Sequence, residues 1–196
     1  MKTKAILFLG PPGCGKTSVC KALNAEKKWM HISFGEELRK SIEEGTANPI
    51  LQQYIDNGLP IPPGFVVPEV EGIIEKHSFA KQFDPSHHIL LFDGFPRNEQ
   101  QYLALREAYE IFSVFLFSVQ DKELLFQRIK NKSRTQQRID DQDDSVIQRR
   151  IDIVNKELPK IRFYFKKENI FEVHSESMNI EEMVKFISQK LEQLSH

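Results

Sequence analysis

Short apolar runs alternate along the chain with longer amphipathic stretches. The strongest strand candidates are residues 4–9, 89–92 and 112–119, and weaker ones are 29–32 and 170–174. These runs are apolar almost throughout, which is typical of strands buried on both faces of a parallel sheet with helical crossovers. The pattern therefore predicts an α/β fold with a doubly wound, parallel five-stranded sheet.

Helical spacing marks the segments between and after these runs. Over 144–165, apolar residues recur at steps of four and three, namely Ile147, Ile151, Val154, Leu158, Ile161 and Phe165. Residues 179–194 repeat this pattern, and Asn179 with Glu182 predicts a capping box at its start. The Pro- and Gly-rich segment 58–68 is predicted to be a stiff loop inside the domain. We expect a single domain over 1–196.

Composition and charge exclude several classes of protein. The chain has 196 residues and a formal net charge of -1, which argues against a nucleic-acid coating protein or a polybasic membrane binder. No apolar run approaches the roughly 20 residues that a membrane span needs. The two cysteines, Cys14 and Cys20, build neither a disulfide framework nor a four-cysteine zinc site. We therefore expect a cytoplasmic protein with reduced thiols that binds neither nucleic acid nor membrane.

A phosphate-binding loop follows the first strand run. Residues 10–17, GPPGCGKT, match G-x-x-x-x-G-K-[ST] and precede a predicted helix over 17–24. Glycines allow successive backbone N–H groups to point at phosphate oxygens, and the helix adds its positive dipole end. The Lys16 ammonium would reach the β- and γ-phosphates, and the Thr17 hydroxyl would ligate Mg²⁺. This spacing predicts binding of a nucleoside triphosphate with Mg²⁺.

Several sequence blocks in the rest of the chain narrow the kind of enzyme. They are SFGEELR at 33–39, DGFPRNEQQ at 93–101, QRIKNKSR at 127–134 and RIDD at 138–141, followed by Arg149. With the phosphate loop, they stand in the order found in the adenylate kinase and UMP/CMP kinase family, which the chain resembles from residue 4 to about 190. Phosphoryl transfer between two nucleotides gathers negative charge, so an excess of arginines is expected. The resemblance implies a monomeric kinase that transfers the γ-phosphoryl group of MgATP to a nucleoside monophosphate.

The resemblance also implies a role for each residue of these blocks. The catalytic groups would be Lys16, Arg97, Lys132, Arg138 and Arg149. ATP would contact Gly10, Pro11, Pro12, Gly13, Cys14, Gly15, Lys16, Thr17, Ser18 and Arg128, with Asp93 holding Mg²⁺ through water. The monophosphate would contact Ser33, Phe34, Gly35, Arg39, Ile61, Gly94, Arg97 and Gln101. A flap over 34–68 would cover it, a short lid over 129–137 would cover ATP, and Asp140 and Asp141 would orient arginines on closure.

The chain departs from the family pattern at two positions. Lys132 stands where the family usually has a second lid arginine. Lysine keeps the positive charge but lacks the guanidinium that can donate two parallel hydrogen bonds. We expect a slower enzyme, not an inactive one. Phe34 stands where the family usually has Thr or Ala, and it could stack on the acceptor base or pack under the flap. Arg128 and Arg138 are too close for a longer, zinc-binding lid, and no cysteine lies between them, so no zinc is expected.

The choice of acceptor depends on Gln101, four residues after Arg97. A glutamine amide both donates to and accepts from the adenine edge, which favours AMP. Asn98 resembles the UMP/CMP kinase pattern, so a pyrimidine kinase stays open as an alternative. A non-catalytic nucleotide-binding module is a second alternative, and Lys132 and Phe34 are the features that support it.

Overall fold

The five predicted strands form one parallel sheet in the computed structural model, which describes residues 2–24, 29–80, 83–84, 87–136 and 143–194. The strands are β1 (Lys4–Leu9), β2 (Trp29–Ser33), β3 (Ile89–Asp93), β4 (Glu110–Ser118) and β5 (Ile170–His174). Their order is β2-β3-β1-β4-β5, and every neighbouring pair is parallel. The predicted doubly wound α/β class is confirmed, and all five strand predictions are right to within two residues at each end.

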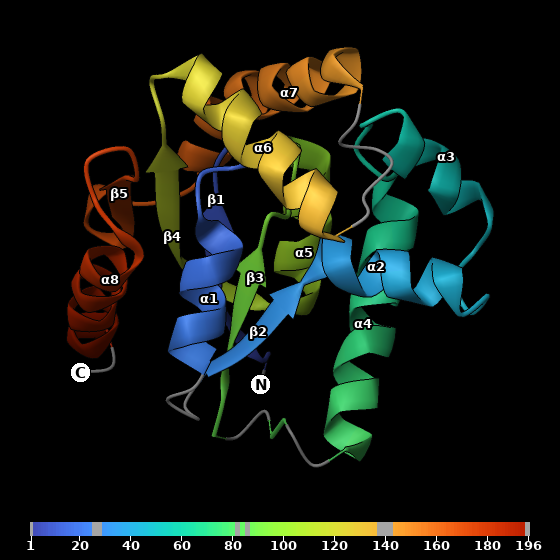
Figure 1. Ribbon diagram of the computed structural model, residues 1–196. Helices are drawn as coiled ribbons and strands as arrows, with labels where there is room; N and C mark the ends of the chain where they lie inside the picture. The colour runs from blue at the N-terminus through green and yellow to red at the C-terminus, as the bar shows by residue number, and fades with distance from the viewer. Residues whose placement is uncertain (1, 25–28, 81–82, 85–86, 137–142, 195–196) are drawn as a thin grey trace.

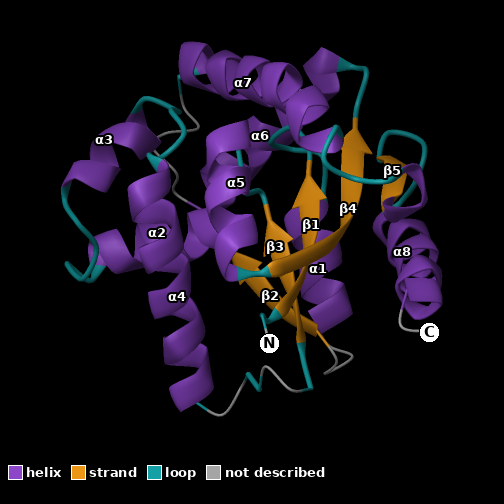
Figure 2. Ribbon diagram, turned by 180° about the vertical axis from the view of Figure 1, so that it is seen from behind, coloured by secondary structure: helices purple, strands orange, loops and turns teal. Residues whose placement is uncertain are grey.

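Alternate residues of the central strand face two separate cores. Ala5, Leu7 and Leu9 pack with α4 (Pro63–Phe79) and α5 (Glu99–Ala108), whereas Ile6 and Phe8 pack with α1 (Lys16–Asn24) and α8 (Ile180–Leu194). Figure 1 shows α1 and α8 in front of the sheet, and Figure 2 shows α4 and α5 in front of the opposite face. Because helices cover both faces, the strands are apolar at nearly every position.

Four helices lie around the carboxyl ends of the strands. They are α2 (Phe34–Glu43), α3 (Ile50–Asp56), α6 (Lys122–Gln136) and α7 (Asp144–Arg162). Figure 1 shows α6 and α7 crossing above the sheet, with α2 and α3 beside them. Ligands of open α/β sheets bind outside the carboxyl ends of the strands, so these helices surround the expected site.

Side chains satisfy backbone groups at three helix starts. Asn98 accepts from the Gln101 N–H at the start of α5, and Asp143 accepts from the Ser145 N–H at the start of α7, both at 2.8 Å. Asn179 and Glu182 exchange reciprocal hydrogen bonds of 2.8 and 2.9 Å before α8. The predicted capping box is therefore confirmed.

The prediction of a loop over 58–68 is wrong for its second half. α4 begins at Pro63, with Pro62 as its N-cap, and runs through Pro68. Proline suits the first helical position, because its missing N–H has no intrahelical partner there and its fixed φ matches the helix. Pro68 leaves the carbonyl of Gly64 without one helical hydrogen bond, and packing of Val66 and Val70 in the core outweighs that loss.

The predicted flap and lid coincide with these helices. Residues 34–68 comprise α2, α3 and the start of α4, and residues 129–136 continue α6. Residue 137 lies outside the described part of the chain. The movement of either segment stays a prediction.

Candidate functional site

The phosphate loop joins the end of β1 to the start of α1. Gly10, Gly13 and Gly15 have φ angles of +152°, +83° and +92°, which curl the loop around its own centre. It borders a cavity of about 1050 Å³, lined on this side by Gly10, Pro12, Gly13, Cys14, Gly15, Lys16, Thr17 and Ser18. Pro11 does not line this cavity, but its carbonyl takes part in holding Lys16. The loop precedes the N-terminus of α1, whose positive dipole end would favour a phosphate held there.

The Lys16 ammonium is folded back onto the loop. It donates to the carbonyls of Gly10 at 2.9 Å and Pro11 at 2.8 Å, and contacts the Cys14 Sγ at 3.2 Å. Its side chain is buried, with the residue 7 % exposed. A buried ammonium that is held only by neutral acceptors gains further from a phosphate oxygen, because the opposite charges attract each other.

Asp93 ends β3 beside the phosphate loop and is 4 % exposed. Its Oδ2 lies 3.1 Å from Nε2 of His31, on the neighbouring strand β2. Burial raises the pKa of Asp93. The His31 hydrogen bond, the positive charge of Lys16 and a hydrogen bond from Thr17 together lower it by more, so the net shift of the pKa is downward. The carboxyl group is therefore ionised at neutral pH.

The pair of Thr17 and Asp93 fits a magnesium ion. A hydroxyl and a carboxylate are oxygen donors, which Mg²⁺ prefers, and the ion keeps several of its waters in such sites. Thr17 and Asp93 are joined by a side-chain hydrogen bond, and both face the phosphate loop cavity. Within the ranges that the structure describes, no three His, Cys, Asp or Glu side chains are grouped in a way that could hold a metal ion.

Two predicted acceptor arginines converge near Gly35. Arg39, on α2, donates to the Gly35 carbonyl, and Arg97 follows β3. A Cβ at Gly35 would lie 3.2 Å from Nη1 of Arg39 and 3.9 Å from Nη2 of Arg97. Ser33 and Gly94 line the same large cavity. The structure thus brings the predicted phosphate contacts together, opposite the phosphate loop.

A smaller cavity of about 20 Å³ adjoins these arginines. Gln101 is 2 % exposed at its edge, where its Oε1 accepts from the Arg97 N–H at 2.6 Å and its Nε2 donates to the Ile61 carbonyl at 2.7 Å. Phe34 is buried, with its ring 5.0 Å from that of Phe95, and both rings line this cavity. Phe34 therefore packs under the flap and also borders the place expected for the acceptor base.

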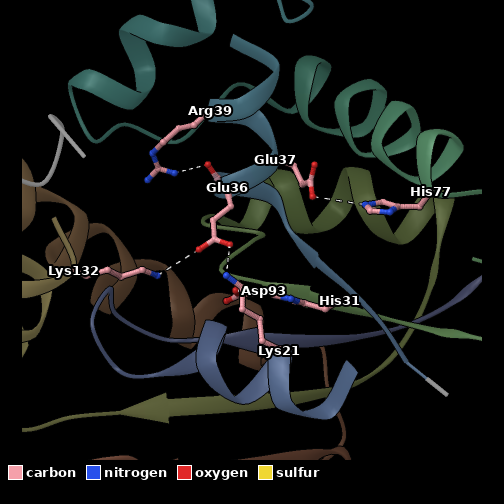
Figure 3. A network of polar contacts seen from close by, with 9 residues as sticks. Lys21, His31, Glu36, Glu37, Arg39, His77, Asp93 and Lys132 are labelled. Carbon is pink, nitrogen blue, oxygen red and sulfur yellow. Dashed lines mark hydrogen bonds and ion pairs between the residues drawn. The ribbon is translucent and has the colours of Figure 1, made fainter. Parts of the chain in front are cut away.

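Three charged side chains from three helices meet at the cavity wall (Figure 3). Glu36 on α2 lies 2.9 Å from the Lys21 ammonium of α1 and 3.6 Å from the Lys132 ammonium of α6. Glu36 and Lys132 both line the large cavity. Lys132 is therefore within reach of the space between donor and acceptor, and its partner belongs to the acceptor flap.

The donor side of the cavity is formed by α6 and the start of α8. Arg128 and Ile129 line it from α6, and the facing wall is formed by Ser175, Met178, Asn179, Ile180, Glu181 and Met183. Nη1 of Arg128 is 3.5 Å from the Ser175 carbonyl. Arg128 therefore lines the same cavity as the phosphate loop, and its contact with the donor base stays a prediction.

The arginines of α7 are arranged differently from the prediction. Arg149 is exposed, and its Nη1 donates to the Asn57 carbonyl at 2.8 Å, outside the lining of the large cavity. Its neighbour Arg150, which has no predicted role, lines both cavities. Arg138, Asp140 and Asp141 lie outside the described residues.

Sequence reasoning missed His31, Glu36 and Arg150. His31 could have been found from strand alternation, because it stands two residues before Ser33 and so shares a face of β2 with it. Glu36 lies inside the recognised block at 33–39, but its two lysine partners come from distant segments. The apolar face predicted over 144–165 places Arg150 beside that face and Arg149 on the opposite side of the helix, a signal that the motif-based assignment did not use.

No described helix has the length and apolar character required to cross a bilayer.

A family model described as adenylate kinase matches residues 8–170. The chain is 27 % identical over 195 residues to an adenylate kinase of Flavobacterium psychrophilum, covering 96 % of this chain and 98 % of that protein. It is 30 % identical over 167 residues to an adenylate kinase of Leptospira biflexa, covering 82 % and 86 %. It is 31 % identical over 165 residues to one of Mycobacterium bovis, covering 81 % and 84 %.

The matched region includes the phosphate loop, the two converging arginines and Gln101, which the structure arranges around one cavity system. The chain belongs to the adenylate kinase family.

Proposed function

We propose that this protein transfers the γ-phosphoryl group of MgATP to AMP and yields two molecules of ADP. The observation that carries the proposal is that one cavity of about 1050 Å³ joins the phosphate loop to Arg39 and Arg97. Two anion-binding sites in one cavity suit transfer between two nucleotides, since most of the catalysis is positioning and charge neutralisation. The relatives compared above are adenylate kinases and do not favour the pyrimidine kinase or the non-catalytic module.

The donor site would bind ATP through the loop backbone and Lys16. The ammonium would leave the Gly10 and Pro11 carbonyls for phosphate oxygens, while Arg128 would lie against the base. Thr17 and Asp93 would hold the magnesium ion, Asp93 through a water, and the ion would neutralise charge on the β- and γ-phosphates. The low pKa of Asp93 keeps that carboxylate ready for the ion at neutral pH.

The acceptor site would hold the AMP phosphate between Arg39 and Arg97, opposite the donor. Gln101 supports adenine, because its amide is buried and fixed at the edge of the small cavity, where it can both donate and accept. The groups that stabilise transfer would be Lys16, Lys132, Arg97 and Arg138, with Asp140 and Asp141 orienting arginines as the lid closes. Arg149, which donates to the Asn57 carbonyl outside the large cavity, would join them only if closure moves it inward. Closure would exclude water, which otherwise accepts the phosphoryl group.

We further propose that the enzyme works as a monomer in the cytoplasm. Its near-neutral charge supports a freely diffusing protein. Gel filtration with light scattering would measure the mass, and a value near twice 22.9 kDa would contradict the monomer.

An acceptor panel tests the activity. The purified protein is incubated with MgATP and, separately, AMP, UMP, CMP, GMP and dAMP, and diphosphate formation is measured. We expect transfer to AMP well above the other ribonucleotides, and almost none in a Lys16→Met variant. Preferential transfer to UMP or CMP would overturn the assignment of AMP. Binding of ATP without transfer to any acceptor would overturn the enzymatic function.

A further inference from the structure

The last turns of α7 contact the first turn of α5, the helix that carries Gln101. Asn98 is the N-cap of α5 and accepts from the Gln101 N–H, so the first N–H of the helix itself belongs to Glu99. The N–H groups of a first turn have no partners within their own helix. Oε2 of Glu157, on α7, accepts from the Glu99 N–H at 3.2 Å. A side chain of α7 thus adds a second cap to α5.

The charge of Glu157 suits this position. Its side chain is partly buried, and its Oε1 lies 2.7 Å from the Lys160 ammonium. Burial raises the pKa of Glu157, but hydrogen bonds from Lys160 and from the Glu99 N–H together lower it by more, so the carboxyl group is ionised at neutral pH. A negative charge at a helix N-terminus is stabilised by the helix dipole. The contact therefore favours this position of α5.

Tyr164 holds the same turn through the side chain of Glu99. Its hydroxyl, just beyond the end of α7, donates to Oε1 of Glu99 at 2.6 Å. Its ring centroid is 5.0 Å from that of Tyr102, which follows Gln101 on α5. Glu99 is therefore bound at its backbone and at its carboxylate by two residues of one segment.

The contacts of the Gln101 amide depend on where this turn lies. Its Oε1 accepts from the Arg97 N–H, and its Nε2 donates to the carbonyl of Ile61, in the predicted flap. Hydrogen bonds weaken steeply as their angles depart from linearity. A small displacement of the first turn of α5 would therefore change the direction in which the amide points.

We propose that Glu157 and Tyr164 are positioning residues for the acceptor base, because they fix the turn of α5 that presents Gln101. This inference rests on the proposed function, in which Gln101 faces the adenine edge. Neither Glu157 nor Tyr164 lines any of the described cavities, so both act through Glu99 and not on the nucleotide. Without their contacts, the enzyme would keep its phosphate sites and lose part of its selectivity for the base.

Two acceptors measure this selectivity: AMP, and the monophosphate of purine riboside, which lacks the exocyclic amino group of adenine. The readout is the ratio of kcat/KM for the two acceptors at saturating MgATP. Tyr164→Phe removes one hydroxyl, Glu157→Ala removes the added cap, and Glu157→Gln keeps an oxygen that can accept from the Glu99 N–H. Tyr109→Phe is the matched control, since Tyr109 is at the other end of α5 and is buried against Phe92.

For Tyr164→Phe and Glu157→Ala we expect the preference for AMP to fall roughly threefold or more, the effect of about one hydrogen bond. Glu157→Gln should fall between, and Tyr109→Phe should match the wild type. A loss of folded enzyme lowers transfer to both acceptors equally, so it does not change the ratio. In a Gln101→Ala background, Tyr164→Phe should leave the ratio unchanged, because its effect passes through that amide.

Three results would overturn the proposal. One is an unchanged preference for AMP in both Tyr164→Phe and Glu157→Ala. Another is an equal effect of Tyr164→Phe with and without Gln101, which would place its action elsewhere. The third is a wild type that does not distinguish the two acceptors, since Gln101 would then not contact the base. A wild type that binds AMP but transfers nothing would contradict the proposed function, and calorimetric Kd values for the two nucleotides would still test the positioning.

Discussion

Gly10 is where the phosphate loop packs most tightly against the sheet, and Gly10→Ala tests how far that packing fixes the donor site. The residue follows β1, and its φ angle is +152°, which L side chains rarely adopt. A Cβ built there would lie 2.5 Å from the carbonyl oxygen of Phe117 and 2.8 Å from its Cβ. Phe117 belongs to β4, which lies between β1 and β5, and is 1 % exposed, so neither atom can turn away as a flexible side chain would.

Two costs add in this variant. Holding a residue with a side chain at such a φ angle costs about 1–3 kcal/mol. Relieving an overpacked contact against a rigid neighbour costs about another 1–3 kcal/mol, because the loop or the strand must shift. We therefore expect Gly10→Ala to lower the free energy of unfolding by about 2–6 kcal/mol. The shift would also move the Gly10 carbonyl that holds Lys16, so KM for MgATP should rise.

Urea unfolding followed by circular dichroism measures the loss, and Gly72→Ala provides the control. Gly72 lies on the exposed face of α4, and a Cβ there would meet nothing within 4 Å. The same substitution should stabilise the protein by about 0.5–1 kcal/mol at that position, through helix propensity. If Gly10→Ala unfolds within about 0.5 kcal/mol of the wild type, the loop tolerates a side chain and our account of its packing is wrong.

Two further predictions concern charged groups of the site. Lys132→Arg should raise kcat roughly threefold to tenfold, because the guanidinium restores a bidentate donor near the transferred group. Steady-state kinetics with AMP would measure this increase. An unchanged or lower kcat would show that Lys132 does not slow the enzyme. The pKa of Asp93 is lowered in the folded protein, so its contribution to stability is complete above the unfolded value of about 4 and is lost as the pH falls through the folded pKa. Between pH 5 and pH 3 the wild type should therefore lose more unfolding free energy than Asp93→Asn, and parallel stability curves for the two proteins would contradict this.

Most of the fold could be predicted from the sequence, because each strand has its own apolar run and the long helices have apolar residues at helical spacing. Continuous apolar runs predicted burial on both faces, and both cores confirm it. Capping residues marked the start of α8 correctly. The loop predicted over 58–68 failed because proline was interpreted as a helix breaker, although Pro63 occupies the first turn of α4, where proline is favourable.

The parts of the site that lie in one short segment could be predicted from the sequence, whereas contacts between distant segments could not. The phosphate loop is one contiguous segment whose glycines, lysine and threonine act through their spacing, so its geometry could be predicted. Lys132 with Glu36 is a contact between α6 and α2, segments almost a hundred positions apart, and only the folded chain brings them together. Which of Arg149 and Arg150 faces the cavity depends on the rotation of α7 about its axis. A motif of neighbouring residues does not specify this rotation, but the apolar face of the helix does.

The small cavity explains why these distant contacts matter for the enzyme. At about 20 Å³ it has room for about one water molecule and none for a base, so we expect the acceptor to enter only after the predicted flap moves away from Gln101. Three interactions oppose this movement at its outer edge: Lys132 with Glu36, the Arg149 hydrogen bond to Asn57, and Arg150 packed at Gly58. The first two are partly or fully exposed to solvent, and such contacts contribute little to stability. We therefore expect the flap to open at small cost, with Lys132 and Arg150, which line the large cavity, on the side from which the phosphate enters.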